Sequence, residues 1–181
     1  MVAHLKTPFF YLLATKSFKE NVLDSILVGA RSYQALLGID FIVKSDCFVE
    51  RHEYILRFNE DNFLHLTGVL TPLSAREFYR KAIDRTLSLT DFDCESTAAL
   101  KGTVRCKARN IRDIGTLLDR AVSVTEKFSS GRVYCLFAAS DGSCTLGFVG
   151  GRILNPNTLL NKSKIDPNDS ITAFTVEKRS R

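Results

Sequence analysis

The sequence of 181 residues lacks tryptophan, has only three histidines and four prolines, and contains no uninterrupted apolar run near the roughly 20 residues that cross a bilayer. A membrane-spanning helix is therefore excluded. The apolar segment Pro8–Ala14 is short and runs into lysines without a persuasive cleavage site, so we expect a cytoplasmic protein. A content of 45% hydrophobic and 25% charged residues excludes a disordered or low-complexity chain and predicts one compact domain over residues 1–181.

Metal-binding spacing is also missing. The five cysteines include no Cys-x-x-Cys pair and the histidines do not cluster, so the sequence predicts neither a metal site nor a cofactor. We expect the cysteines to be small buried apolar residues, with about one thiol exposed. The glycines of Gly147–Arg152 lack the spacing of a phosphate-binding loop, so nucleotide binding is not predicted.

Positive charge is in modest excess, with 25 Lys and Arg against 20 Asp and Glu, a formal net charge of +5. The excess is uneven, because the segment from Arg105 to Arg132 carries seven Lys or Arg and only three acids. Such a segment suits a polyanionic partner, since each neutralised phosphate releases counterions. Ordinary solvated helix faces explain the same pattern equally well.

Capping signals and apolar spacing predict the helices. Ser17 and Glu20 have capping-box spacing before a helix over residues 18–37, and Ser74 precedes a short helix that buries Phe78 and Tyr79. Asp93 is placed to cap another short helix that ends at Gly102. Asn110 is a good cap for a second long helix that ends before Gly131.

Alternating and apolar segments predict strands at residues 39–43, 53–58, 132–139, 144–149 and 171–178, with a hairpin turn at Asp141-Gly142. A polar loop is expected from Asn155 to Ser170. The expected fold is α+β, with N-terminal helices packed on a mostly antiparallel sheet.

The most unusual local string is Asn62-Phe-Leu-His65-Leu-Thr67-Gly68-Val69. In an extended segment, alternation would aim His65 and Thr67 in the same direction. A histidine can take or give a proton near neutral pH, and a threonine can donate a hydrogen bond to a phosphate. The alternative is structural: His65 satisfies a main-chain carbonyl in the core and Gly68 makes a turn.

The stretch from Phe58 to Val69, which contains this string, is followed by the short Phe78-Tyr79 helix, by a later long helix, and by the string Asn155-Pro-Asn-Thr158-Leu-Leu160 before a final strand that ends in Lys178. In these features the chain resembles the fourth family of phage-associated Barnase-EndoU-Colicin-RelE-like nucleases. The resemblance spans about residues 20 to 180. It implies N-terminal helices on a sheet of about four antiparallel strands. It also implies metal-independent cleavage of RNA in a phage or mobile-element system, without a cofactor.

The resemblance carries catalytic roles over to His65, Thr67, Thr158 and Lys178. Cleavage of RNA without a metal needs a base for the 2′-hydroxyl proton, an acid for the leaving 5′-oxygen, and groups that stabilise the charged phosphorane. His65 would be the base or acid, the two threonines would donate hydrogen bonds to the phosphate, and Lys178 would stabilise negative charge. No second acid or base partner for His65 is evident in the sequence.

Substrate-binding roles are expected for Arg57, Arg76 and Lys81, which lie within about 20 residues of His65 and could hold a phosphate backbone. Arg76 and Lys81 can equally well decorate an exposed helix face. The tighter group Arg105, Lys107, Arg109 and Arg112 would sit at the start of the predicted long helix, where it would serve an anionic ligand or lie in a solvated loop.

The leading hypothesis is therefore an endoribonuclease with RNA as its partner. The alternative is a catalytically inactive module of a phage or defence system that binds nucleic acid or an acidic protein. A toxin-like domain held inactive by a cognate inhibitor protein is a third hypothesis. Fold resemblance alone does not decide among them, because the same fold carries many activities.

Overall fold

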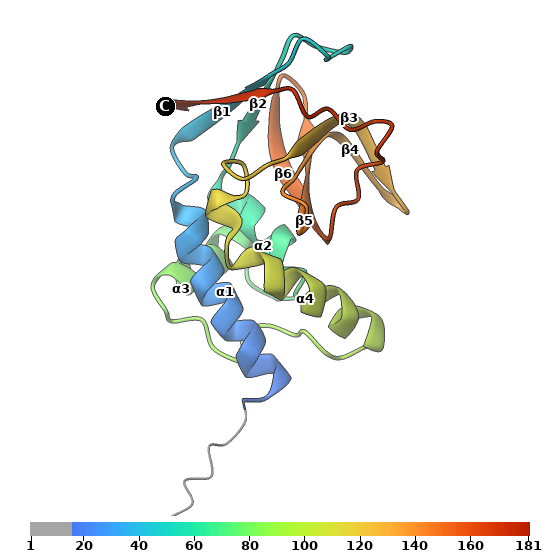
Figure 1. The fold of residues 1–181 in the computed structure, drawn as a ribbon. Coiled ribbons are helices and arrows are strands. Elements are labelled where there is room, and N and C mark those ends of the chain that lie inside the picture. The colour runs from blue at the N-terminus through green and yellow to red at the C-terminus, as the bar shows by residue number, and fades with distance from the viewer. Residues whose placement is uncertain (1–15) are drawn as a thin grey trace, which may run out of the picture.

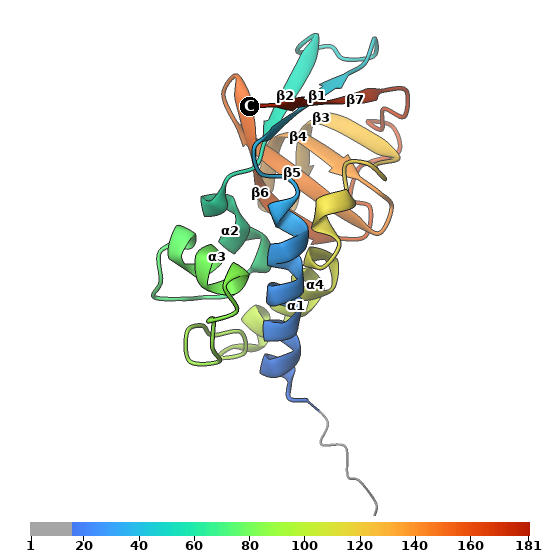
Figure 2. The same ribbon diagram turned by 90° about the vertical axis from the view of Figure 1, so that its left-hand side faces the viewer.

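A computed structural model describes residues 16–181; the Pro8–Ala14 segment lies outside the described residues. Four α-helices and two short 3₁₀ helices gather on one side of a seven-stranded sheet (Figures 1 and 2). No helix among the described residues is long and apolar enough to cross a membrane. The helices are α1 (Phe18–Gln34), η1 (Glu60–Asn62), α2 (Phe63–Thr67), α3 (Ala75–Ile83), α4 (Ala98–Ile111) and η2 (Ile114–Thr116).

The predicted capping serines do cap their helices. The Ser17 side chain accepts the amide of Glu20, whose carboxylate accepts the amide of Ser17, and α1 ends three residues earlier than predicted. The Ser74 side chain accepts the amide of Glu77 at the start of α3.

The two later helices are not where the sequence predicts them. Thr97 caps α4, which runs through Gly102 to Ile111, whereas the Asp93 carboxylate accepts the amides of Glu95 and Ser96 in a separate turn. The expected helix from Asn110 to residue 130 is wrong. Its residues instead end α4, form η2 and a turn, and then enter a strand from Ser123, because pairing with the next strand satisfies the backbone of this β-branched stretch.

The sheet has the order β3-β4-β5-β6-β2-β1-β7, and all pairs are antiparallel except β2 with β6. The α+β class and the mostly antiparallel sheet are confirmed, but seven strands replace the expected four. The strands are β1 (Ile39–Lys44), β2 (Glu53–Arg57), β3 (Ser123–Ser130), β4 (Val133–Ser140), β5 (Cys144–Gly150), β6 (Ile153–Asn161) and β7 (Thr175–Ser180).

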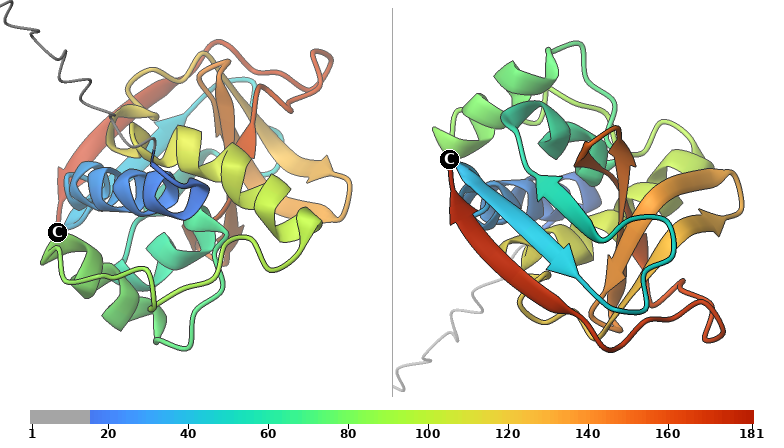
Figure 3. Two further views of the ribbon diagram at one scale, coloured as in Figure 1. Left: turned by 90° about the horizontal axis from the view of Figure 1, so that it is seen from below. Right: turned by 90° about the horizontal axis from the view of Figure 1, so that it is seen from above.

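Strand β6 occupies the first half of the expected polar loop. Its polar residues pair with β5, and Pro156 lies where the register between the two strands shifts, which is where a residue without an amide hydrogen is tolerated. Only the segment after Asn161 is a loop. This loop returns to the far edge of the sheet, where Ile171 pairs with Val124 of β3 before the chain enters β7, so the sheet curls (Figure 3).

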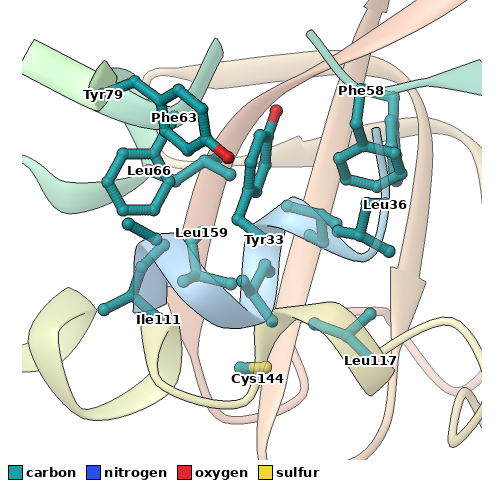
Figure 4. Packing of buried hydrophobic residues seen from close by; sticks show 14 of the residues in the cluster. Tyr33, Leu36, Phe58, Phe63, Leu66, Tyr79, Ile111, Leu117, Cys144 and Leu159 are labelled. Atoms are coloured by element: carbon teal, nitrogen blue, oxygen red, sulfur yellow. The ribbon is translucent and has the colours of Figure 1, made fainter. Parts of the chain in front are cut away.

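The main core lies between the helices and the sheet. The rings of Tyr33, Phe58, Phe63 and Tyr79 meet there, with Tyr33 in contact with the other three (Figure 4). The Tyr33 hydroxyl donates to the Asn59 carbonyl at 2.9 Å, which ties α1 to the segment before α2. Three of the five cysteines are buried; Cys47 and Cys106 are exposed, one thiol more than expected.

Candidate functional site

The His65 string forms the short helix α2 and is not extended. Residues two apart in a helix point about 200° away from each other, so His65 and Thr67 do not face the same way. Phe63, Leu66 and Thr67 are buried, while His65 is exposed on the opposite side. The histidine is therefore accessible and is not a core residue.

Thr67 closes the end of α2. Its hydroxyl donates to the Leu64 carbonyl at 2.7 Å and accepts the Val69 amide at 3.4 Å, and its side chain is 2% exposed. Gly68 follows with φ of +74°, the left-handed conformation that commonly ends a helix. The Thr67 hydroxyl thus has local partners that hold the turn.

Lys107 of α4 reaches across to this turn. Its Nζ donates to the main-chain carbonyl of His65 at 2.7 Å, and its side chain runs past Gly68, where a Cβ would lie 2.7 Å from Lys107 Cδ. Burial lowers the pKa of Lys107 to about 8, and no carboxylate of residues 16–181 forms an ion pair with it. A lysine of this kind is partly deprotonated near neutral pH.

Beside Lys107 lies a cavity of about 460 Å³ between α4 and the end of β6. Its wall includes three lysines and no aspartate or glutamate, so its electrostatic character favours an anion. The apolar and neutral part of the wall provides a thiol, two hydroxyls and an amide. The lining residues are Thr103, Cys106, Lys107, Ser130, Leu159, Leu160, Asn161, Lys162 and Lys164.

Helix α4 carries further positive charge on its side toward α1. The sequence of α4 contains four basic residues and no acid, and Figure 3 shows the helix running beside α1 across the base of the molecule. Arg105 lies over the Phe18 ring, and the Arg112 guanidinium donates to the Ser25 hydroxyl, so both cations lie on the side toward α1. The basic group lies in the C-terminal half of a helix and not at the start of one, and the helix dipole there favours cations.

Thr158 and Lys178, the other two expected catalytic residues, lie on different strands. Thr158 is buried on β6, where its methyl group lies 2.9 Å from the position that a Cβ on Gly147 would take. Lys178 lies on β7, which is separated from β6 by the two strands β2 and β1, and its Nζ pairs with Asp119 at 2.7 Å. Among the described residues, no hydrogen bond joins any two of the four side chains proposed for catalysis.

The residues expected to bind substrate each have a carboxylate partner. The Arg57 guanidinium donates two hydrogen bonds to Asp40, at 2.8 and 2.7 Å, and this contact is the main cause that lowers the pKa of Asp40. Arg76 pairs with Asp61 at 3.1 Å, and Lys81 pairs with Asp91 at 2.9 Å. Their positive charge is thus largely neutralised, in contrast to that of the lysine pocket.

The sequence indicated Lys107 only as a member of a basic group that would serve an anionic ligand or lie in a solvated loop, and it did not single out Lys162 and Lys164, which the fold brings beside Lys107. Within residues 16–181, no group of three or more His, Cys, Asp or Glu side chains could hold a metal ion. The lining of the pocket suits an anion, and one of its lysines, Lys107, contacts the main-chain carbonyl of His65.

A family model for phage-Barnase-EndoU-ColicinE5/D-RelE like nuclease4 matches residues 25–170, in agreement with the resemblance predicted from the sequence. No significant match was found among curated proteins or among solved structures. The matched segment contains α2, α4 and the whole lysine pocket, but it stops before β7 and Lys178. The chain therefore belongs to this family and is a phage-associated nuclease-like domain, for which a nucleic acid is the substrate to expect.

Proposed function

We propose that this protein is a metal-independent endoribonuclease that binds the phosphate backbone of RNA in the lysine pocket. The observation that carries the proposal is the pocket of about 460 Å³ whose wall holds Lys107, Lys162 and Lys164 and no carboxylate. An acid-free wall attracts a phosphate and disfavours a bound divalent cation. His65 is exposed, and its main-chain carbonyl accepts the ammonium of Lys107, one of the residues that line the pocket.

The chemistry needs only groups that exchange protons or carry positive charge. A base removes the proton of a ribose 2′-hydroxyl, whose oxygen attacks the adjacent phosphorus. The bond from phosphorus to the 5′-oxygen then breaks, and an acid protonates that oxygen, which leaves a 2′,3′-cyclic phosphate and a 5′-hydroxyl. His65 is the proposed base, and the lysines of the pocket stabilise the extra negative charge of the phosphorane.

The test is cleavage of end-labelled RNA of mixed sequence by the purified chain in excess chelator. We expect the wild type to produce fragments that end in a cyclic phosphate, and His65→Ala to lose most of this activity. Lys44→Ala is the matched control, because Lys44 is an exposed cation on β1 that pairs with Glu177 of β7 and does not line the pocket. Equal cleavage by wild type and His65→Ala would remove His65 from the mechanism, and no cleavage by the wild type would refute the nuclease proposal.

Alkylation of the exposed thiols can report whether RNA binds in the pocket. Cys106 lines the pocket and Cys47 does not, yet both thiols are exposed, while the other three are buried. RNA that occupies the pocket should slow alkylation of Cys106 and leave that of Cys47 unchanged. Selective protection without cleavage would favour the alternative of a catalytically inactive binding module.

A further inference from the structure

The turn after α2 holds a single lysine in place through main-chain groups. The His65 carbonyl accepts the Lys107 ammonium at 2.7 Å, and Gly68 leaves room for the lysine stem, since a Cβ there would lie 2.7 Å from Lys107 Cδ and 3.5 Å from Cε. Gly68 also adopts φ of +74°, so backbone conformation and space both favour glycine at this position. We call the His65 carbonyl and Gly68 together the lysine seat.

If Lys107 served only to hold the end of α2, its side chain would not need to line a cavity. Lys107 lines the pocket, and within residues 16–181 its ammonium donates to one acceptor, the His65 carbonyl. An ammonium carries three hydrogens, so two remain for a group bound in the pocket. The same seat that fixes the amine therefore leaves it able to contact a ligand.

We propose that Lys107 is a catalytic residue of this pocket, which donates a proton to the leaving 5′-oxygen of RNA, and that Gly68 is its positioning residue. The inference rests on the proposed nuclease function and supplies the acid partner for His65. His65 takes the 2′-hydroxyl proton, the 2′-oxygen bonds to phosphorus, and the bond to the 5′-oxygen breaks. The ammonium of Lys107 gives one proton to that oxygen and the resulting amine regains a proton from water.

The surroundings of Lys107 suit its proposed role as a general acid. Burial lowers its pKa to about 8, so about nine tenths of the amine is protonated at pH 7 and the proton is released far more readily than from a solvated lysine. Besides Lys107, the titratable groups that line the pocket are Cys106 of α4 and Lys162 and Lys164 after β6. His65 contacts Lys107 through its main-chain carbonyl. None of them carries a carboxylate, whose negative charge would raise the pKa of Lys107.

The first experiment separates catalysis from binding. Lys107→Ala should lower kcat on the order of 100-fold and change KM only a few-fold, because Lys162 and Lys164 still bind phosphate. Lys107→Arg should keep RNA binding and show low kcat, and the fall in wild-type rate above about pH 8 should be absent, because a guanidinium does not titrate in that range. A Lys107→Ala variant that keeps the wild-type kcat and raises only KM would overturn the catalytic role.

The second experiment tests the seat, with a matched pair of glycines. Gly38 has φ of +76°, close to that of Gly68, but nothing lies within 4 Å of a Cβ added there. Gly38→Ala therefore introduces the backbone strain alone, whereas Gly68→Ala also displaces the lysine. Gly68→Ala should lower kcat at least 10-fold more than Gly38→Ala, and equal effects would refute the positioning role.

A third experiment tests the seat without RNA. The lysine amines are acylated at a series of pH values, and mass spectrometry measures how far each one has reacted. Lys107 should become reactive with a midpoint near pH 8 in the wild type and in Gly38→Ala, and at higher pH in Gly68→Ala. A midpoint for wild-type Lys107 near 10.5, the ordinary value of a lysine, would overturn the seat. No RNA cleavage by the wild type would instead overturn the nuclease function and the catalytic role of Lys107 together, so the two failures are distinguishable.

Discussion

Lys107→Met should stabilise the folded protein at neutral pH while it abolishes the proposed activity. Methionine keeps most of the length of the side chain that runs past Gly68 but removes the ammonium. In the wild type, folding places this cation where burial lowers its pKa from 10.5 to about 8. The folded state therefore disfavours the protonated form, and the substitution removes that penalty.

The size of the effect follows from the same values. A decrease in pKa from 10.5 to about 8 corresponds to roughly 3.4 kcal/mol if the amine were fully shielded from water. Lys107 is only partly buried and borders an open pocket, and the variant also loses the hydrogen bond to the His65 carbonyl. We therefore expect a net gain of about 1 kcal/mol in the free energy of unfolding at pH 7.

The pH dependence identifies the cause. Between pH 8 and 10.5 the unfolded wild type binds more protons at this lysine than the folded one, so wild-type stability should rise with pH relative to the variant. Urea unfolding of both proteins from pH 7 to 11 should thus show the advantage of the variant shrinking. A variant that is less stable than the wild type by the same amount at every pH would refute the reasoning and make Lys107 a structural side chain.

Three other substitutions test the remaining assignments. Asp40→Asn should lower the free energy of unfolding by about 1 to 2 kcal/mol at pH 7, because an uncharged amide can accept only one of the two hydrogen bonds from Arg57. The loss should shrink as pH falls through the lowered pKa of Asp40, and urea titrations of both proteins from pH 7 into the acid range check it. Gly102→Ala, on the exposed side of α4 with nothing within 4 Å of the new Cβ, should raise stability by about 0.5 to 1 kcal/mol, and a lower melting temperature would contradict this. Lys178→Ala breaks an exposed ion pair with Asp119 and should change stability by less than about 1 kcal/mol and RNA cleavage by less than 2-fold; a larger loss of cleavage in a stable variant would place Lys178 in the site.

Local signals predicted the elements that depend on neighbours in the chain. The capping serines at the starts of α1 and α3 and the Asp141-Gly142 turn act within four residues, and each lies where the sequence places it. The segment after Asn110 was misassigned because an apolar spacing of three and four residues also fits a 3₁₀ turn followed by a strand. Pairing with β4 decides that this segment is the strand β3, and no local rule takes that pairing into account.

The sequence by itself determined the family, the α+β class, the first helix and the unusual His65 string, because these depend on residue types at short spacing. Only the tertiary structure decided what the string does. It folds as a helix, so the side chains of His65 and Thr67 diverge, and the His65 carbonyl and Gly68 hold Lys107 from 42 residues away. Burial then changed the acidity of that lysine, and acidity in a folded protein depends on surroundings that distant segments build together.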